Sequence, residues 1–150
     1  MTTDLTPFDG SPIAFGEITD EMLDHIEDRL EQIALNTGVP FEAPVDHAFA
    51  GGIYMRTVFV PAGSLVVSHI HKTEHHYAVL MGEVSVAIAG GPVERFAAPR
   101  TGITKPGTRR LVYAHRDTVW TTYHATEETD VEKIAEMILE PRRRKTPCLG

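Results

Sequence analysis

The chain has 150 residues, of which 42% are hydrophobic and 23% are charged, with a formal net charge of −7. This length suits one domain with a real core, and no apolar run approaches the roughly 18 residues of a membrane span. The first residues lack a secretion signal, and the single cysteine, Cys148, cannot form an internal disulfide. We therefore expect a cytoplasmic domain that binds neither nucleic acid nor a membrane.

Residues 1–44 are predicted to form an irregular arm followed by a helix. Thr19 is a typical N-cap, acidic residues follow it in the first turn, and Gly38 with Pro40 stops the helix. Apolar residues recur at helical spacing and predict one buried stripe opposite an acidic outer face. These residues are Met22, Ile26, Leu30 and Ile33.

Residues 45–125 are predicted to form a β-barrel or sandwich, because short β-rich runs alternate with glycine and proline and no helix intervenes. The expected strands are Ile53–Val60, Ser64–His71, His75–Met81, Glu83–Ala89, Val93–Ala97, Leu111–Tyr113 and Thr118–His124. A second helix is expected within 126–141, because Thr129 and Glu132 have capping-box spacing and Pro141 ends the pattern. Residues 142–150 carry four basic residues and are expected to be a solvated, partly disordered tail.

Four of the eight histidines lie between Gly63 and Gly82, at His69, His71, His75 and His76. On the expected strand His69 and His71 share a face, and His75 begins the returning strand, so these rings can converge while His76 points away. Converging neutral imidazoles favour a divalent transition metal, and iron, zinc, nickel and manganese are the ions considered. The alternatives to a metal site are that the four histidines cluster by chance or that they form an acid-sensing group.

This stretch resembles the first motif of the cupin superfamily, G-x5-H-x-H-x3,4-E-x6-G. Gly63, His69, His71 and Gly82 have the motif's spacing, while His75 stands at its glutamate position and Glu74 is the second choice there. The resemblance implies an all-β, cupin-type jelly-roll barrel with a helix at each end, as a single domain over residues 1–150.

The second cupin motif is less well matched, because Arg109 and Arg110 stand where its histidine is expected. A fourth ligand would then be His115 or His124. If Leu111–Tyr113 and Thr118–His124 form a hairpin, His124 lies opposite Pro106–Gly107, near the motif's usual ligand.

Three segments also resemble small single-domain cupins encoded in bacteriophage genomes: IHKTEH (70–75), PGTRR (106–110) and YAHRDTVWTTYH (113–124). The histidines shared with those proteins match His71, His75 and His124, which leaves His69 the less certain ligand. This resemblance implies the host cytoplasm as the location.

Four side chains are candidates for binding a small, anionic substrate: Arg56, Arg110, Tyr77 and Tyr113. For each, a structural role in the barrel is the alternative. The favoured function is a metalloenzyme with no catalytic residue assigned; a non-catalytic ligand-binding protein and a phage structural protein are the rivals. A homodimer is expected, because pairing between subunits covers barrel edges.

Overall fold

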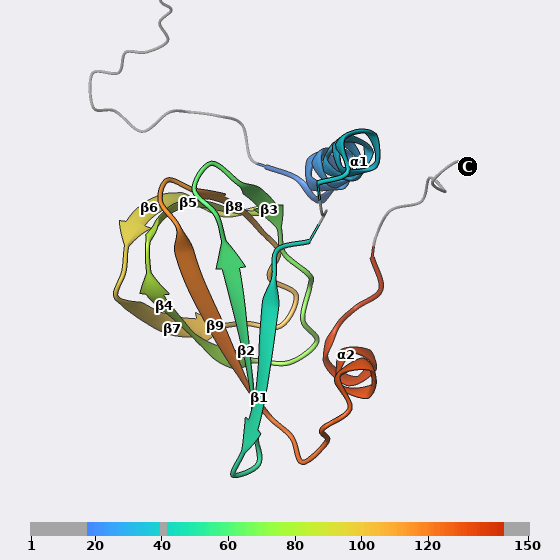
Figure 1. Ribbon diagram of the computed structural model, residues 1–150, viewed down its shortest axis with the longest axis vertical. Helices are drawn as coiled ribbons and strands as arrows, with labels where there is room; N and C mark the ends of the chain where they lie inside the picture. Colours follow the sequence, from blue (N-terminus) through green and yellow to red (C-terminus); the bar gives the residue numbers. More distant parts are fainter. Residues whose placement is uncertain (1–17, 40–41, 143–150) are drawn as a thin grey trace, which may run out of the picture.

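The computed structural model describes residues 18–39 and 42–142 (Figure 1). Two helices flank nine strands in this part of the chain. The elements are α1 (Asp20–Thr37), β1 (Val45–Ala50), β2 (Ile53–Val60), β3 (Leu65–Val67), β4 (His75–Met81), β5 (Glu83–Ile88), β6 (Val93–Ala97), β7 (Arg100–Thr104), β8 (Arg110–Ala114), β9 (Thr118–Ala125) and α2 (Val131–Ile138). No helix in the described ranges is long and apolar enough to cross a membrane.

The strands form two antiparallel sheets that face each other. One sheet has the order β1-β2-β9-β4-β7 and the other has the order β3-β8-β5-β6. Figure 1 shows the sheets closing into a barrel, with both helices on the side of β1 and β3 and away from β6 and β7. The barrel therefore has an interior that the two sheets share, and one end of it is next to the helices.

The register of β2 and β9 decides which side chains point into the barrel. Tyr54 pairs with His124, and Arg56 pairs with Thr122, so that these four side chains share the inner face. Alternation along each strand sends the residues between them to the outer face. A histidine near the end of β9 thus comes to lie inside the barrel.

Helix α1 begins after the Thr19 cap and ends at Gly38, as predicted, but its buried face differs from the predicted stripe. Leu23 and Glu27 are the buried residues, whereas Met22 and Ile33 are about half exposed. The acidic side faces the barrel because Arg109, which is almost fully buried, forms ion pairs with three acidic side chains of α1. The predicted acidic outer face is therefore wrong.

Helix α2 packs against the barrel through its apolar side. Ile134 and Ile138 are buried and form an apolar cluster with Tyr54 of β2, to which Leu139 also packs. The N-cap is Asp130, one residue after the expected Thr129, and its side chain accepts hydrogen bonds from the backbone of Glu132 and Lys133. This cluster brings α2 to the inner face of the long sheet.

The strands differ from the predicted ones in three respects. The strand expected over Ser64–His71 ends at Val67, so that His69 and His71 lie in the connection to β4. Two strands without a prediction are present, β1 and β7. Finally, β8 and β9 belong to different sheets and do not form the expected hairpin, because β8 pairs with β3 and β5 while β9 pairs with β2 and β4.

Candidate metal centre

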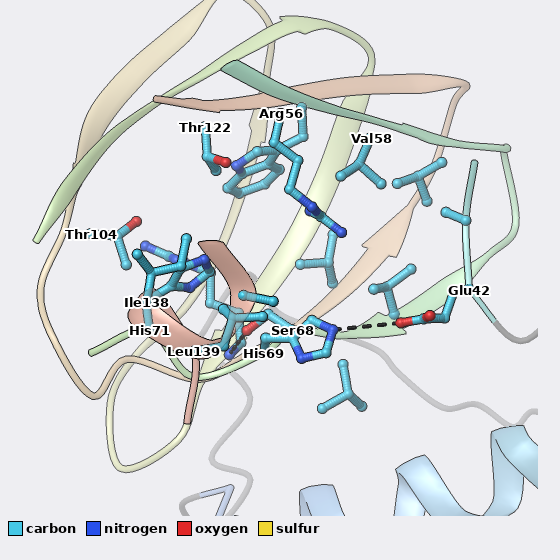
Figure 2. A pocket seen from close by; sticks show the side chains of 18 of the residues that line it. Glu42, Arg56, Val58, Ser68, His69, His71, Thr104, Thr122, Ile138 and Leu139 are labelled. Carbon is cyan, nitrogen blue, oxygen red and sulfur yellow. Dashed lines mark hydrogen bonds and ion pairs between the residues drawn. The ribbon is translucent and has the colours of Figure 1, made fainter. Parts of the chain in front are cut away.

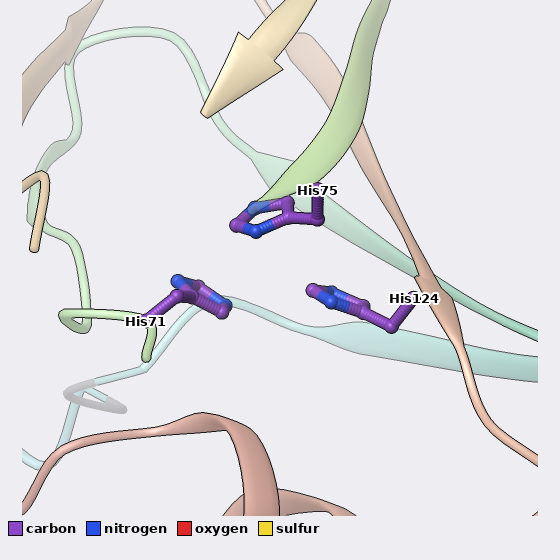
Figure 3. Close-up of side chains that lie close together, drawn as sticks. All are labelled: His71, His75 and His124. Atoms are coloured by element: carbon purple, nitrogen blue, oxygen red, sulfur yellow. The ribbon is translucent and has the colours of Figure 1, made fainter. Parts of the chain in front are cut away.

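Three histidines from separate parts of the chain converge inside the barrel: His71, His75 and His124 (Figure 3). His75 is the first residue of β4, and His124 is the seventh residue of β9. His71 lies between β3 and β4, where its backbone bridges to Leu139 and its carbonyl accepts a hydrogen bond from the amide of Gly107. Two strands and one tethered loop therefore fix the three rings.

The three rings are close enough to share one ion. One ring nitrogen of each histidine lies within 4.8 Å of those of the other two. The ring centroids of His71 and His75 are 4.3 Å apart, those of His75 and His124 are 4.5 Å apart, and those of His71 and His124 are 5.4 Å apart. Imidazole nitrogens bind zinc at about 2.0–2.1 Å, so nitrogens at this separation fit around one ion.

The hydrogen bonds around two of these histidines leave a lone pair for a metal. Nδ1 of His75 donates to the carbonyl oxygen of Thr73 at 3.2 Å, which leaves Nε2 as the basic nitrogen. Nε2 of His124 lies 2.9 Å from the hydroxyl of Thr122, while Nδ1 is buried without a hydrogen-bond partner among the described residues. A buried orphan nitrogen is costly, and a bound cation would satisfy it.

Burial keeps these imidazoles neutral, which is the form that binds metal. Burial lowers the pKa of His71 to about 3, with the neighbouring His75 and His124 adding to the effect. Burial likewise lowers the pKa of His124 to about 4, and it lowers the pKa of His75. Three neutral rings at one point form a ligand set suited to zinc, iron, nickel or copper.

A cavity of about 190 Å³ lies next to the cluster, and His71 and His75 form part of its wall (Figure 2). Most of the remaining wall is apolar and comes from both sheets and from α2. The apolar residues include Val58, Val60, Leu65, Val67, Val112, Ile134, Ile138 and Leu139. The candidate metal centre therefore adjoins a partly open, mainly apolar cavity.

Arg56, Arg110 and Arg142 supply positive charge to this cavity. Arg56 of β2 projects into it (Figure 2), and Arg110 of β8 is also part of the wall. The guanidinium of Arg110 lies over the rings of Tyr77 and Trp120, at 5.4 Å and 5.9 Å, and burial lowers its pKa. The guanidiniums of Arg56 and Arg110 have no carboxylate within ion-pair distance in the described ranges, although Arg56 lies near enough to Glu42, another wall residue, to lower the pKa of that carboxyl.

An ionic cluster borders the cavity on the side of the helices, and His69 belongs to it rather than to the histidine triad. Nε2 of His69 lies 3.5 Å from Glu42, whose pKa is lowered mainly by the hydrogen bond with His69. Arg142 contacts Glu42 at 3.1 Å and also pairs with Glu27 of α1. Arg142 is therefore held by two carboxylates and is not part of a solvated tail; residues 143–150 lie outside the described ranges.

The other proposed site residues lie away from the triad and do not line the cavity. Tyr77 is buried between the Trp120 ring and Gly102. Tyr113 is partly exposed and packs edge-on against His115, whose Nε2 lies 2.7 Å from the hydroxyl of Ser85. His76 is exposed, and Glu74 is exposed and forms an ion pair with Lys105 at 2.7 Å.

Several cavity residues were not singled out in the sequence. Tyr54, Thr104 and Thr122 contribute polar atoms to the wall, and α2 contributes Ile134 and Ile138. The alternation of β2 was a usable signal for Tyr54, because it lies two residues from Arg56 on the same strand. Thr104 lies on β7, which the sequence did not predict as a strand.

Several solved structures of other proteins are similar to this chain. The chain is similar to DMSP lyase DddQ from Ruegeria pomeroyi (16% identity, TM-score 0.50, covering 63% of this chain and 52% of that one). It is also similar to a cupin family protein with a double-stranded β-helix fold from Methanocaldococcus jannaschii (10% identity, TM-score 0.48, covering 56% of this chain and 80% of that one). A third similar structure is an acetylacetone dioxygenase from Acinetobacter johnsonii (17% identity, TM-score 0.43, covering 54% of this chain and 58% of that one). No protein-family model matches the sequence, and no curated protein is detectably similar to it.

The chain thus has the cupin-type jelly-roll fold that the sequence predicted, with a candidate three-histidine metal centre inside the barrel. At these identities the likeness extends to the fold, and the activities named above are those of the other proteins. The resemblance to bacteriophage-encoded cupins is not shown by these comparisons and stays a prediction.

Proposed function

We propose that this chain is a mononuclear metalloenzyme that binds a divalent transition metal ion through His71, His75 and His124 and acts on a small anionic molecule in the adjoining cavity. The observation that supports it most directly is the number of histidine ligands beside a partly open cavity. A structural zinc site is closed by four protein ligands, whereas a catalytic site has three and keeps a position for substrate or water. Within the described ranges, three histidines gather at this point.

The metal supplies chemistry that the protein's own side chains lack here. When bound, such an ion is a Lewis acid, or a redox centre if the metal is redox-active. The chain's residues hold the imidazoles in place: Thr73 and Thr122 fix the orientation of His75 and His124. The apolar wall excludes water, and an electrostatic interaction inside it is stronger than at the surface.

The proposed substrate is a small carboxylate with an apolar body. Arg56 and Arg110 reach the cavity without a carboxylate partner from the described chain, so an anionic group of the substrate would provide the counter-charge. The aliphatic walls suit an apolar body. A space of about 190 Å³ limits the ligand to a small molecule.

Matched pairs of ligands test this function. Benzoate and hexanoate are compared with benzamide and hexanamide by calorimetric titration, using metal-loaded and metal-free protein. We expect the carboxylates to bind better than the amides, to bind better with metal present, and to bind at least about tenfold more weakly to Arg56→Gln. Arg95→Gln is the control, because Arg95 is exposed and lies on β6, outside the cavity.

Mass spectrometry of the bound carboxylates then separates an enzyme from a binding protein. Consumption of a carboxylate by the metal-loaded protein supports the enzyme, and binding without consumption supports a non-catalytic ligand-binding protein. Equal binding of carboxylates and amides, or binding that ignores the metal, would overturn the proposed site.

A further inference from the structure

The outer face of the long sheet carries large apolar side chains that no described element covers. The residues between the cavity-lining positions of β2, β4, β7 and β9 point to this face. Six large apolar side chains on these four strands are between 37% and 58% exposed: Ile53, Met55, Phe59, Leu80, Met81 and Ile103. Both helices lie on the side of β1 and β3, as Figure 1 shows.

The strand register arranges this face into rows that cross the sheet. One row runs from β2 to β7 through Met55, Tyr123, His76 and Ile103. The next row contains only small side chains: Thr57, Thr121, Ala78 and Thr101. The third row is large again and contains Phe59, Val119 and Met81. The face therefore has two rows of large side chains separated by a row of small ones, of which Ala78 and Thr121 are buried.

We propose that this outer face of the β1-β2-β9-β4-β7 sheet binds a second copy of the same chain, with the exposed apolar side chains of one copy packed against those of the other. A two-fold interface joins the same surface of both copies, and an apolar face can pack against itself in this way. Two twisted sheets pack face to face in this way at about 10 Å separation. The proposal is independent of the metal centre, which lies on the opposite side of the sheet.

The charge of the chain favours this face over the rest of the surface for self-association. Two copies with a formal net charge of −7 each repel one another, so they can meet only where the contact itself brings few like charges together. On β2, β9, β4 and β7 the three rows contain no aspartate, glutamate, lysine or arginine, and at the β1 edge Asp46 continues the middle row. A charged partner would find this one carboxylate at the edge and no other charge in the rows, whereas an identical copy needs none.

The apolar area also matches what a dimer needs. The six large side chains expose on the order of 500 Å² of apolar surface, within the range at which a patch marks an interaction site. A standard interface buries about 800 Å² per partner, of which about 500 Å² is apolar when the interface joins two identical subunits. This face supplies that apolar share within one continuous surface.

Light scattering on the full-length protein at increasing concentration tests the proposal. We expect the wild type to be a dimer at micromolar concentration. Met55→Glu and Ile103→Glu, at opposite ends of one row, should each weaken the dimer by at least about 100-fold, because each new carboxylate occurs twice in a two-fold interface. Leu35→Glu is the matched control, since Leu35 is 68% exposed on α1, outside this face.

Two checks separate the interface from folding. Ile103 is the more exposed of the two positions, so Ile103→Glu alone tests the dimer interface if Met55→Glu does not fold. Circular dichroism and metal content should be unchanged in the variants. A monomeric wild type would overturn the proposal and leave the face to a partner other than a second copy. A dimer that survives both substitutions, or one that Leu35→Glu also dissociates, would overturn it as well.

Discussion

Arg109 and Glu27 form an ion pair in which both side chains are almost fully shielded from solvent, with Nη2 of Arg109 3.4 Å from Oε1 of Glu27. The same guanidinium lies 2.8 Å from Asp24 and 3.3 Å from Asp20. These contacts connect the turn before β8 to three positions of α1 that are three or four residues apart. The almost fully buried Arg109, together with Arg142 on Glu27, thus fixes both the position and the rotation of the helix.

Replacing Arg109 by alanine should destabilise the protein by about 2–3 kcal/mol, because the buried Glu27 keeps only its ion pair with Arg142 while Asp20 and Asp24 lose their contact with Arg109. Denaturation in urea measures the loss as a decrease in the free energy of unfolding. Arg95→Ala is the control: Arg95 pairs with Glu83 at 2.8 Å in an exposed position, and its removal should cost less than about 1 kcal/mol. Equal effects of the two substitutions would show that the Arg109 cluster does not anchor α1.

The ion cluster also explains why the buried face of α1 could not be predicted from its own sequence. Periodicity places Met22 and Ile33 on an apolar stripe, yet the barrel contacts Leu23 and Glu27. The deciding partner, Arg109, is 82 residues away from Glu27 in the chain. Helix position follows from local signals such as the Thr19 cap, whereas helix rotation depends on a distant partner.

The candidate metal centre could also be predicted only in part, because local sequence signals do not show which distant residues meet. The cupin resemblance and the spacing of the histidines pointed to His71 and His75, and the resemblance added His124. The alternation rule then grouped His69 with His71, because a strand was expected to continue through both. The strand ends at Val67, and His69 turns toward Glu42 instead. Strand β7 was not predicted because Gly102 lowers its strand propensity, although a Cβ at this position would lie only 2.7 Å from the Tyr77 ring.

The stability of the metal-free protein should fall as the pH decreases below about 6.5, the ordinary pKa of an imidazole. The folded-state pKa values of His71 and His124 are about 3 and 4, so the unfolded chain binds more protons between these values and 6.5. The histidine contribution is fully present above pH 6.5 and is lost as the pH falls through 4 and 3. Urea denaturation across this range measures it, and the variant His71→Gln with His124→Gln should have a flatter profile. An equally steep profile in this variant would contradict the assignment.

Replacing Arg110 by methionine should stabilise the ligand-free protein by about 1 kcal/mol and weaken carboxylate binding. The guanidinium is desolvated against two aromatic rings without a carboxylate partner in the described chain, so an apolar side chain of similar length suits the empty cavity better. Thermal denaturation and titration with benzoate measure the two effects. A variant that loses stability and keeps its affinity for benzoate would show that Arg110 is structural.

The metal content of purified, tag-free protein and its histidine variants tests the central claim most directly. We expect elemental analysis to find close to one divalent transition metal ion per wild-type chain. His71→Ala, His75→Ala and His124→Ala should each lose the ion while the barrel stays folded, whereas His69→Ala and His76→Ala should keep it. Full metal content in any of the first three variants, or no metal in the wild type after incubation with iron, zinc, nickel or manganese, would contradict a metal centre at these residues.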